Sequence, residues 1–284
     1  MPKFAANLTM MFTEVPFLNR FAAAADAGFS AVEFLFPYEH SPREVARHSK
    51  AAGVEVILFN MPAGNWNAGE RGIACVPGRE EEFRAGLEKA LDYALVLGTS
   101  RLHAMAGIVP QGADRAECRA ALIENFKYAA GRLAKHNITL LLEAINTRDM
   151  PGFLISTQVD SHSICKSVNL PNVKMQMDVY HMQVMEGDLA TKLRSYAADC
   201  GHIQIAGCPE RNEPDTGEVQ FEYLYRLLDE ISYQGWVGCE YRPAHKTIDG
   251  LGWMRPFSAV ETSLKALRVT ERILSGEVSL RSRT

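Results

Sequence analysis

Residues 138–145 read Ile-Thr-Leu-Leu-Leu-Glu-Ala-Ile, a short apolar run that carries one carboxylate, Glu143, near its end. Runs of this kind are typical of strands buried on both faces of a parallel sheet that helices cover. The preceding segment has apolar residues at the spacing of one helical face, at Leu122, Ile123, Phe126, Ala130 and Leu133. We therefore predict a helix followed by a buried strand, which is the repeating unit of an α/β protein.

The same alternation repeats on both sides of this unit. The expected strands are Phe4–Met10, Ala31–Phe36, Val54–Asn60, Arg101–Ala106, Ile138–Ile145, Val173–Val179, His202–Ala206 and Trp236–Tyr241. The expected helices are Phe17–Ala27, Pro42–Ala52, Arg79–Leu97, Arg115–His136, Val159–Val168, Leu189–Ala198, Phe221–Ile231 and Ser258–Leu274. This order fits a closed (β/α)₈ TIM barrel or an open doubly wound sheet.

Two observations favour the closed barrel. The first strand lacks a glycine-rich dinucleotide fingerprint, because Ala5, Ala6 and Asn7 stand where glycines would be needed. A chain of 284 residues also suits one barrel, and no linker divides it. We predict a single catalytic TIM-barrel domain over residues 1–275, followed by a polar C-terminal tail over residues 276–284.

Composition narrows the classes of partner. The formal net charge of −4 argues against a nucleic-acid-binding surface over the whole protein. No stretch approaches the roughly 18 to 20 apolar residues that cross a membrane, so we expect no membrane partner. The six cysteines are scattered without a CxxC pair, which is typical of reduced thiols in a cytoplasmic protein.

Polar side chains lie near the ends of four of the expected strands, in the place where a TIM barrel forms its active site. They are Glu143, Asp178, Gln204 and Glu240. Three carboxylates that converge on one barrel mouth repel each other, and a divalent cation resolves this most simply. An all-oxygen set favours Mg²⁺ or Mn²⁺. Pairing of each carboxylate with a nearby Arg or Lys is the structural alternative.

The seventh strand leaves one choice open. His202 and Gln204 are two residues apart, so their side chains face the same side of the strand. His202 is therefore an alternative ligand, although its deeper position favours a hydrogen-bonding role inside the barrel.

Several longer strings carry a family resemblance. They are Phe4-Ala5-Ala6-Asn7-Leu8, Val32-Glu33-Phe34-Leu35-Phe36-Pro37-Tyr38, Ala68-Gly69-Glu70-Arg71-Gly72, Pro77-Gly78-Arg79-Glu80, Asp178-Val179-Tyr180-His181-Met182-Gln183 and Gly238-Cys239-Glu240-Tyr241-Arg242-Pro243. With them the chain resembles the hydroxypyruvate isomerase family, within the xylose isomerase-like TIM barrels, from about Phe4 to Trp253. One departure is Arg242, where lysine is expected more often.

The resemblance implies an intramolecular oxidoreductase that interconverts hydroxypyruvate and tartronate semialdehyde. It implies that Glu143, Asp178, Gln204 and Glu240 bind a divalent metal, and that Glu143 and Glu240 are the catalytic acid/base pair. The metal would assist proton transfer through an enediolate. Barrels of this family often associate, so a homo-oligomer is possible.

Four further residues are candidates for binding the substrate. Arg211 follows the seventh strand and would bind a carboxylate through its fork, unless it is a solvated loop residue. His181 would donate to a substrate oxygen, a role that comes mainly from the resemblance. His103 and Glu70 are weaker candidates: the first fits equally a core histidine, and the second lies in an exposed or site-covering loop with Trp66.

Other functions fit parts of the pattern. The same residues suit a 2-oxo-tetronate isomerase or a ketose 3-epimerase, although the epimerases usually carry histidine at the position of Gln204. A DNA-repair nuclease of the endonuclease IV type ranks lower, because the eight histidines are dispersed and the net charge is negative. A barrel that binds its small hydroxy-keto acid or sugar without turnover is a third possibility.

Overall fold

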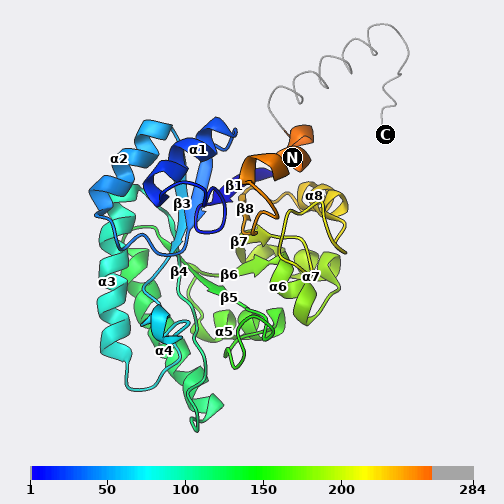
Figure 1. The fold of residues 1–284 in the computed structure, drawn as a ribbon. Helices are drawn as coiled ribbons and strands as arrows, with labels where there is room; N and C mark the ends of the chain where they lie inside the picture. The colour runs from blue at the N-terminus through cyan, green and yellow to red at the C-terminus, as the bar shows by residue number, and fades with distance from the viewer. Residues whose placement is uncertain (1, 258–284) are drawn as a thin grey trace, which may run out of the picture.

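The computed structural model describes residues 2–257 and shows a closed parallel barrel. Its strands are β1 (Lys3–Asn7), β2 (Ala31–Phe34), β3 (Glu55–Asn60), β4 (Arg101–His103), β5 (Thr139–Glu143), β6 (Val173–Asp178), β7 (Cys200–Ile205) and β8 (Trp236–Cys239). They pair in chain order, and β8 pairs with β1 to close the ring (Figure 1). The TIM-barrel prediction is therefore confirmed.

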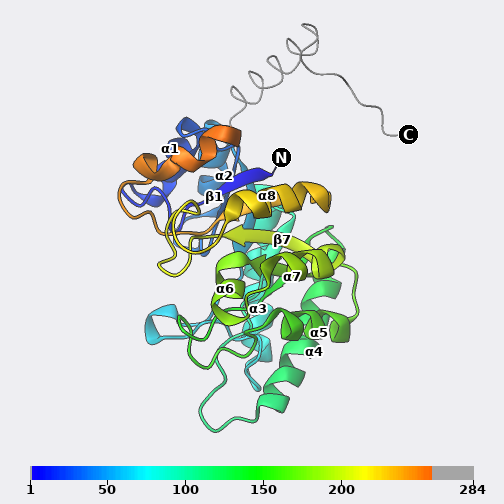
Figure 2. The same ribbon diagram turned by 90° about the vertical axis from the view of Figure 1, so that its right-hand side faces the viewer.

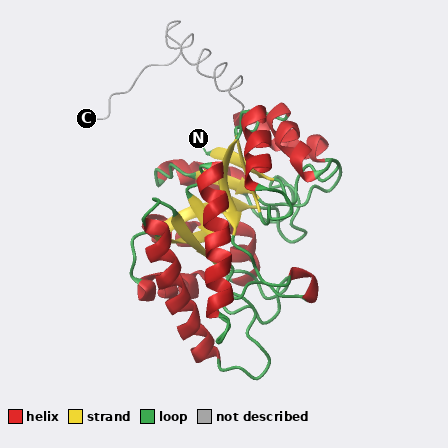
Figure 3. Ribbon diagram, turned by 90° about the vertical axis from the view of Figure 1, so that its left-hand side faces the viewer, coloured by secondary structure: helices red, strands yellow, loops and turns green. Residues whose placement is uncertain are grey.

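Helices form the outer layer around the strands (Figures 2 and 3). The α-helices are α1 (Arg20–Asp26), α2 (Pro42–Ala52), α3 (Glu80–Leu97), α4 (Arg115–Ala134), α5 (Gln158–Val168), α6 (Val179–Met185), α7 (Leu189–Tyr196) and α8 (Phe221–Glu230). Short 3₁₀ segments are η1 (Phe17–Asn19), η2 (Trp66–Ala68), η3 (Ala197–Asp199) and η4 (Thr247–Phe257). No helix between residues 2 and 257 is long and apolar enough to span a bilayer.

One helix was not predicted. The segment Val173–Val179 alternates apolar and polar residues and reads as one strand, but β6 ends at Asp178 and α6 begins at the next residue. The Asp178 side chain accepts a hydrogen bond from the backbone N–H of Tyr180, which makes it the N-cap of α6. The expected helix Ser258–Leu274 and the tail 276–284 lie outside the described residues, as does the end of the expected domain.

The barrel interior is divided into an apolar floor and a polar upper part. A small cluster of buried side chains fills the floor, formed by Ala5, Ala31, Ile57, Leu58 and Leu141. Because side chains alternate along a strand, residues two positions further along face the same interior. On β1, β2 and β5 those residues are Asn7, Glu33 and Glu143, all of them buried. The apolar floor therefore fills the lower part of the barrel, and the polar side chains lie above it, toward the carboxyl ends of the strands.

A second, larger cluster of apolar side chains lies between the strands and the helices. Leu140 and Leu142 belong to it, whereas Leu141 between them belongs to the floor. This explains why the fifth strand is apolar at successive positions: each face of it is buried, one by helices and one by the barrel interior.

Candidate active site

The four predicted ligands stand at the carboxyl ends of four consecutive strands. Glu143 and Asp178 are the last residues of β5 and β6, Gln204 is near the end of β7, and Glu240 directly follows β8. All four side chains are buried. Glu143, Gln204 and Glu240 line one pocket in the barrel mouth. Asp178 is joined to this group through two intervening side chains, described below.

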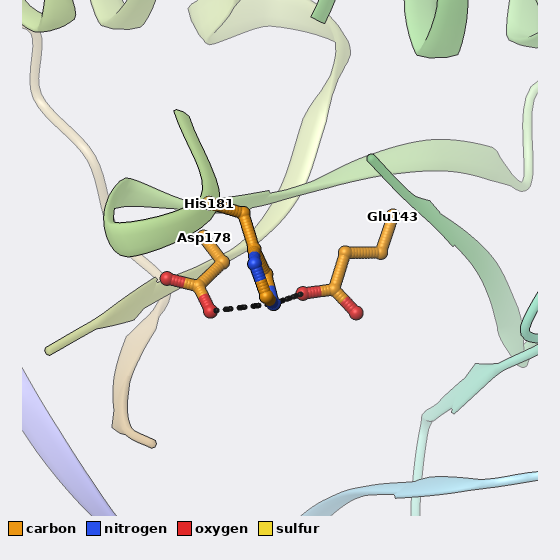
Figure 4. A group of neighbouring side chains, drawn as sticks. All are labelled: Glu143, Asp178 and His181. Carbon is orange, nitrogen blue, oxygen red and sulfur yellow. Dashed lines mark ion pairs between the residues drawn. The ribbon is translucent and has the colours of Figure 1, made fainter. Parts of the chain in front are cut away.

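His181 connects the first two carboxylates. Its Nε2 lies 3.8 Å from a Glu143 oxygen and 3.6 Å from an Asp178 oxygen. Ligand atoms of the three residues lie within 4.8 Å of one another, and Figure 4 shows the side chains converging. His181 and Asp178 come from the junction of β6 and α6, so the early start of that helix brings the histidine to the site.

The hydrogen bonds of His181 determine which ring nitrogen carries the proton. The backbone N–H of Asn146 donates to Nδ1 at 3.3 Å, and the Asn146 side-chain nitrogen lies 2.6 Å from the same atom. Burial, with the nearby charge of Arg211, lowers the pKa of His181 well below its usual value. The ring is therefore neutral at neutral pH, with its proton on Nε2. It presents an N–H donor to the space between the carboxylates.

Arg211 connects Asp178 to Glu240. Its Nη2 lies 3.3 Å from an Asp178 oxygen and 3.6 Å from a Glu240 oxygen. The guanidinium is buried and lies over the Tyr180 ring, with 4.8 Å between its carbon and the ring centroid. Burial opposes the charge of Arg211, but the surrounding carboxylates, Glu240 first, raise its pKa. Arg211 is therefore a fixed cation inside the site and not a solvated loop residue.

The buried carboxyls resist ionisation without further positive charge. Burial raises the pKa of Glu143 well above its usual value, and the charges of Glu240 and Asp178 raise it further. Burial raises the pKa of Glu240 to about 8, against the opposing effect of Arg211. Burial also raises the pKa of Asp178, again against Arg211. One guanidinium therefore does not compensate three carboxylates that are shielded from water.

Buried polar atoms in the pocket lack a partner among the described residues. They are His103 Nε2, Glu143 Oε1 and Gln176 Oε1. The Asn60 amide oxygen lies 3.2 Å from His103 Nδ1 and accepts a hydrogen bond from its N–H. In the neutral ring Nε2 then carries a lone pair, and it lies 3.7 Å from a Glu143 oxygen. Unpartnered buried atoms are rare, so their convergence indicates a ligand. Oxygen donors, unsatisfied charge and a shared pocket fit a hard divalent cation and a small polar substrate.

The structure also bears on the choice between His202 and Gln204 and on the position of His103. His202 Nε2 lies 2.7 Å from an oxygen of Glu33, and His202 does not line the pocket, which favours Gln204 over His202 as the ligand. His103 does line the pocket. Burial lowers the pKa of His103 to about 3, so this ring is neutral.

The structure does not bring Glu70 to this cluster. Its carboxylate pairs with Arg79 and accepts a hydrogen bond from the backbone N–H of Asn65, so it organises its own loop. That loop is packed through Trp66, whose ring contacts Phe36 edge-on with 5.1 Å between centroids. A substrate contact by Glu70 would require this loop to rearrange.

Sequence reasoning missed several polar residues of the interior. Glu33 and Gln176 line the pocket, and Asn60 and Asn146 orient the two histidines. A signal for Gln176 was available, because it lies two positions before Asp178 on the same expected strand and so faces the same side.

Known proteins match this chain over most of its length. The family model described as xylose isomerase-like TIM barrel matches residues 21–257. A 2-oxo-tetronate isomerase of Cupriavidus necator is 54% identical over 257 residues, which are 90% of this chain and 99% of the relative. The hydroxypyruvate isomerase of Escherichia coli is 46% identical, over 90% of this chain and 100% of the relative.

A solved structure is similar over nearly the whole fold. It is described as an AP endonuclease, family 2, from Brucella melitensis, with a TM-score of 0.89 and 51% sequence identity. The match covers 91% of this chain and 100% of that chain. The resemblance that the sequence strings indicated is confirmed by these matches. The chain therefore belongs to the xylose isomerase-like TIM barrel family and, within it, to the group that contains hydroxypyruvate isomerases and 2-oxo-tetronate isomerases.

Proposed function

We propose that the chain isomerises a small hydroxy-keto acid by moving a proton between adjacent carbons, with hydroxypyruvate and tartronate semialdehyde as the substrate pair. One observation carries the proposal: two buried glutamates, Glu143 and Glu240, face one pocket beside the buried guanidinium of Arg211. Moving a proton along a carbon chain requires a base, an acid and positive charge near the forming enediolate, and these residues would supply them.

The two glutamates would transfer the proton. Burial raises the pKa of both carboxyls, and a raised pKa makes each carboxylate a stronger base than an ordinary one. One glutamate would remove the proton from carbon, and the same or the other would return it to the neighbouring carbon, while the hydroxyl proton moves from the oxygen of the first carbon to the oxygen of the second.

Arg211 and the histidines would orient the substrate. The Arg211 fork suits the two oxygens of a substrate carboxylate. The Nε2–H of His181 would donate to a substrate oxygen, and the Nε2 lone pair of His103 would accept from a substrate hydroxyl. The contact with His103 satisfies a buried atom that otherwise has no partner within residues 2–257.

The site residues also fit a divalent cation. Glu143, Asp178, Gln204 and Glu240 would hold it, and their oxygen donors favour Mg²⁺ or Mn²⁺. When bound, the cation supplies positive charge that polarises the substrate carbonyl and makes the adjacent proton more acidic.

The test of the catalytic pair is substitution of each glutamate by its amide. Glu143→Gln and Glu240→Gln should each lower kcat for hydroxypyruvate by at least about 10²–10⁴-fold, because an amide cannot accept the proton. Turnover is followed by coupled reduction of the aldehyde product. Glu210→Gln, on an exposed residue beyond β7, is the control and should leave kcat unchanged. Near-normal kcat in either site variant would exclude that glutamate from the proton transfer.

A four-carbon substrate is the second candidate. It is favoured by the relative at 54% identity, which is named 2-oxo-tetronate isomerase. Assays with three- to six-carbon keto acids and ketoses, with kcat/KM compared across the panel, decide between the two acids and a ketose 3-epimerase. Binding of the acids without turnover, with Mg²⁺ or Mn²⁺ present, would support the non-catalytic alternative.

The nuclease alternative is supported by the description of the Brucella melitensis structure as an AP endonuclease, but the residues of the site oppose it. Among residues 2–257 the one group of acidic, histidine or cysteine side chains placed to hold a metal contains a single histidine. The net charge of −4 also disfavours a DNA backbone. Cleavage of a duplex with an abasic site would reverse this ranking.

The proposal includes a cytoplasmic location. All six cysteines are free, and five of them are buried, which suits a reducing compartment. The expectation of a homo-oligomer stays a prediction that sedimentation of the purified protein would test.

A further inference from the structure

Glu33 is a buried carboxylate in the barrel interior to which the proposed reaction assigns no role. It lies on β2, and its side chain is 1% exposed. Three donors converge on it: Asn7 Nδ2 at 3.1 Å, Gln204 Nε2 at 2.7 Å and His202 Nε2 at 2.7 Å. Both carboxylate oxygens are therefore engaged by neighbours from β1 and β7.

The contact with Gln204 has a direction. A carboxylate only accepts hydrogen bonds, so Gln204 turns its NH₂ group toward Glu33 and its oxygen away. That oxygen, Oε1, accepts a hydrogen bond of 2.7 Å from Gln176 Nε2. Gln176 therefore also turns its own oxygen away, and this atom lies unpartnered among the described residues of the pocket. One carboxylate thus sets the orientation of two amides in series.

Inversion of the Gln204 amide alone, with Gln176 unchanged, would be unfavourable at both ends. Its oxygen would meet the acceptor Glu33, and its NH₂ group would meet the NH₂ group of Gln176. In the observed orientation Oε1 uses one lone pair for Gln176 and keeps the other for a ligand.

The local backbone makes room for Glu33 in this position. A Cβ atom on Gly238 of β8 would lie 2.3 to 2.5 Å from the carboxyl atoms of Glu33. Glu33 faces the interior by the ordinary alternation of the strand, two positions after the interior residue Ala31. The missing side chain at Gly238 therefore leaves the space that this carboxylate occupies.

We propose that Glu33 is a positioning residue that fixes the Gln204 amide with its oxygen toward the divalent-cation site. The inference rests on the proposed function for the cation but assigns a new role to Glu33, which acts through Gln204 and touches neither cation nor substrate. Groups that orient a ligand in this way typically change metal affinity about 10- to 100-fold when they are replaced.

The experiment is a double-substitution cycle read by Mn²⁺ binding without substrate. Free Mn²⁺ is measured by electron paramagnetic resonance for the wild type, Glu33→Gln, Gln204→Glu and the double variant. In Glu33→Gln the new amide can donate to the oxygen of an inverted Gln204, so this substitution should weaken Mn²⁺ binding about 10- to 100-fold. A glutamate at position 204 presents an oxygen in either orientation, so Glu33→Gln should cause no loss in that background.

The cycle separates orientation from charge. If Glu33 acts only through its negative charge, Glu33→Gln weakens Mn²⁺ binding equally in both backgrounds, and this result overturns the proposal. Unchanged Mn²⁺ affinity in Glu33→Gln overturns it as well. The double variant keeps one carboxylate and one amide in contact, so it preserves their hydrogen bond if the single variant unfolds. It should bind Mn²⁺ at least as tightly as the wild type, and a loss of about 10- to 100-fold would contradict the positioning role.

Turnover of hydroxypyruvate and 2-oxo-tetronate is measured on the same wild-type preparation. Mn²⁺ binding without turnover of either acid refutes the proposed function, while the cycle still decides the role of Glu33. Absence of Mn²⁺ binding to the wild type overturns the positioning role.

Discussion

Gly238 has no side chain, and this leaves the space in the barrel interior that the Glu33 carboxyl occupies. The Glu33 carboxyl that lies beside it is hydrogen-bonded through both oxygens, so it has little freedom to move aside. Gly238→Ala should therefore lower the free energy of unfolding by about 1–3 kcal/mol, as overpacking of a dense interior does. Urea unfolding measures this, and Mn²⁺ titration should show weaker binding by the same variant.

Gly131 provides the matched control for that substitution. It lies in α4, is exposed, and a Cβ atom there would meet nothing within 4 Å. Gly131→Ala should raise the free energy of unfolding by about 0.5–1 kcal/mol, because glycine is unfavourable inside a helix. A Gly238→Ala protein as stable as Gly131→Ala would show that the Glu33 carboxyl moves without cost.

Individual site residues were predictable to different degrees. Glu143, Asp178 and Glu240 stand out because each carboxylate comes near the end of an expected strand, and the barrel topology then brings the strand ends together. Glu33 lies within the apolar segment 31–36, where a single charge gives no sign of whether it faces inward. The pairing of His181 with Asn146 joins residues 35 positions apart, a contact that no local pattern encodes.

At the scale of elements, α2 shows how local signals fix a helix. Ser41 accepts a hydrogen bond from the Glu44 backbone N–H, Pro42 is the first helical residue, and Gly53 takes a left-handed conformation after the last turn. The sequence predicted the bounds Pro42–Ala52 correctly because these signals lie within the element itself. By contrast, α6 begins directly after the last residue of β6, and no loop separates the strand from the helix.

The cap of α2 gives a prediction about stability. Ser41→Ala removes the acceptor of the Glu44 N–H and should lower the free energy of unfolding by about 0.5–2 kcal/mol. Urea unfolding of the variant is compared with that of Ser30→Ala, a substitution of an exposed serine in the loop before β2. Equal unfolding midpoints for the two variants would mean that the cap adds nothing to α2.

At the scale of the whole molecule, the three buried carboxyls link stability to pH. Burial raises the pKa of Glu143, Asp178 and Glu240 in the folded state. Between the ordinary histidine pKa near 6.5 and about 8, the neutral rings of His103 and His181 no longer offset these carboxyls, so the folded metal-free protein holds more protons than the unfolded chain. Its free energy of unfolding should fall as pH rises through this range, since stability decreases where the folded state binds more protons.

A divalent cation should reverse this trend, because it binds the deprotonated carboxylates. Thermal unfolding with and without Mn²⁺ should show a larger rise of Tm at about pH 8 than at about pH 5.5. Calorimetry in buffers of different ionisation enthalpy should show proton release on binding. Glu240→Gln, which removes one of the titrating groups, should release fewer protons. An equal rise of Tm at both pH values would contradict the linkage.

The apolar plug of Ala5, Ala31, Ile57, Leu58 and Leu141 closes the barrel below the carboxylates. Substrate therefore enters and product leaves through the opposite end of the barrel, so one molecule must leave before the next can bind. Under the proposed function, the aldehyde product and its ketone precursor exclude each other, so steady-state kinetics should display mutual competitive inhibition in both directions of the reaction.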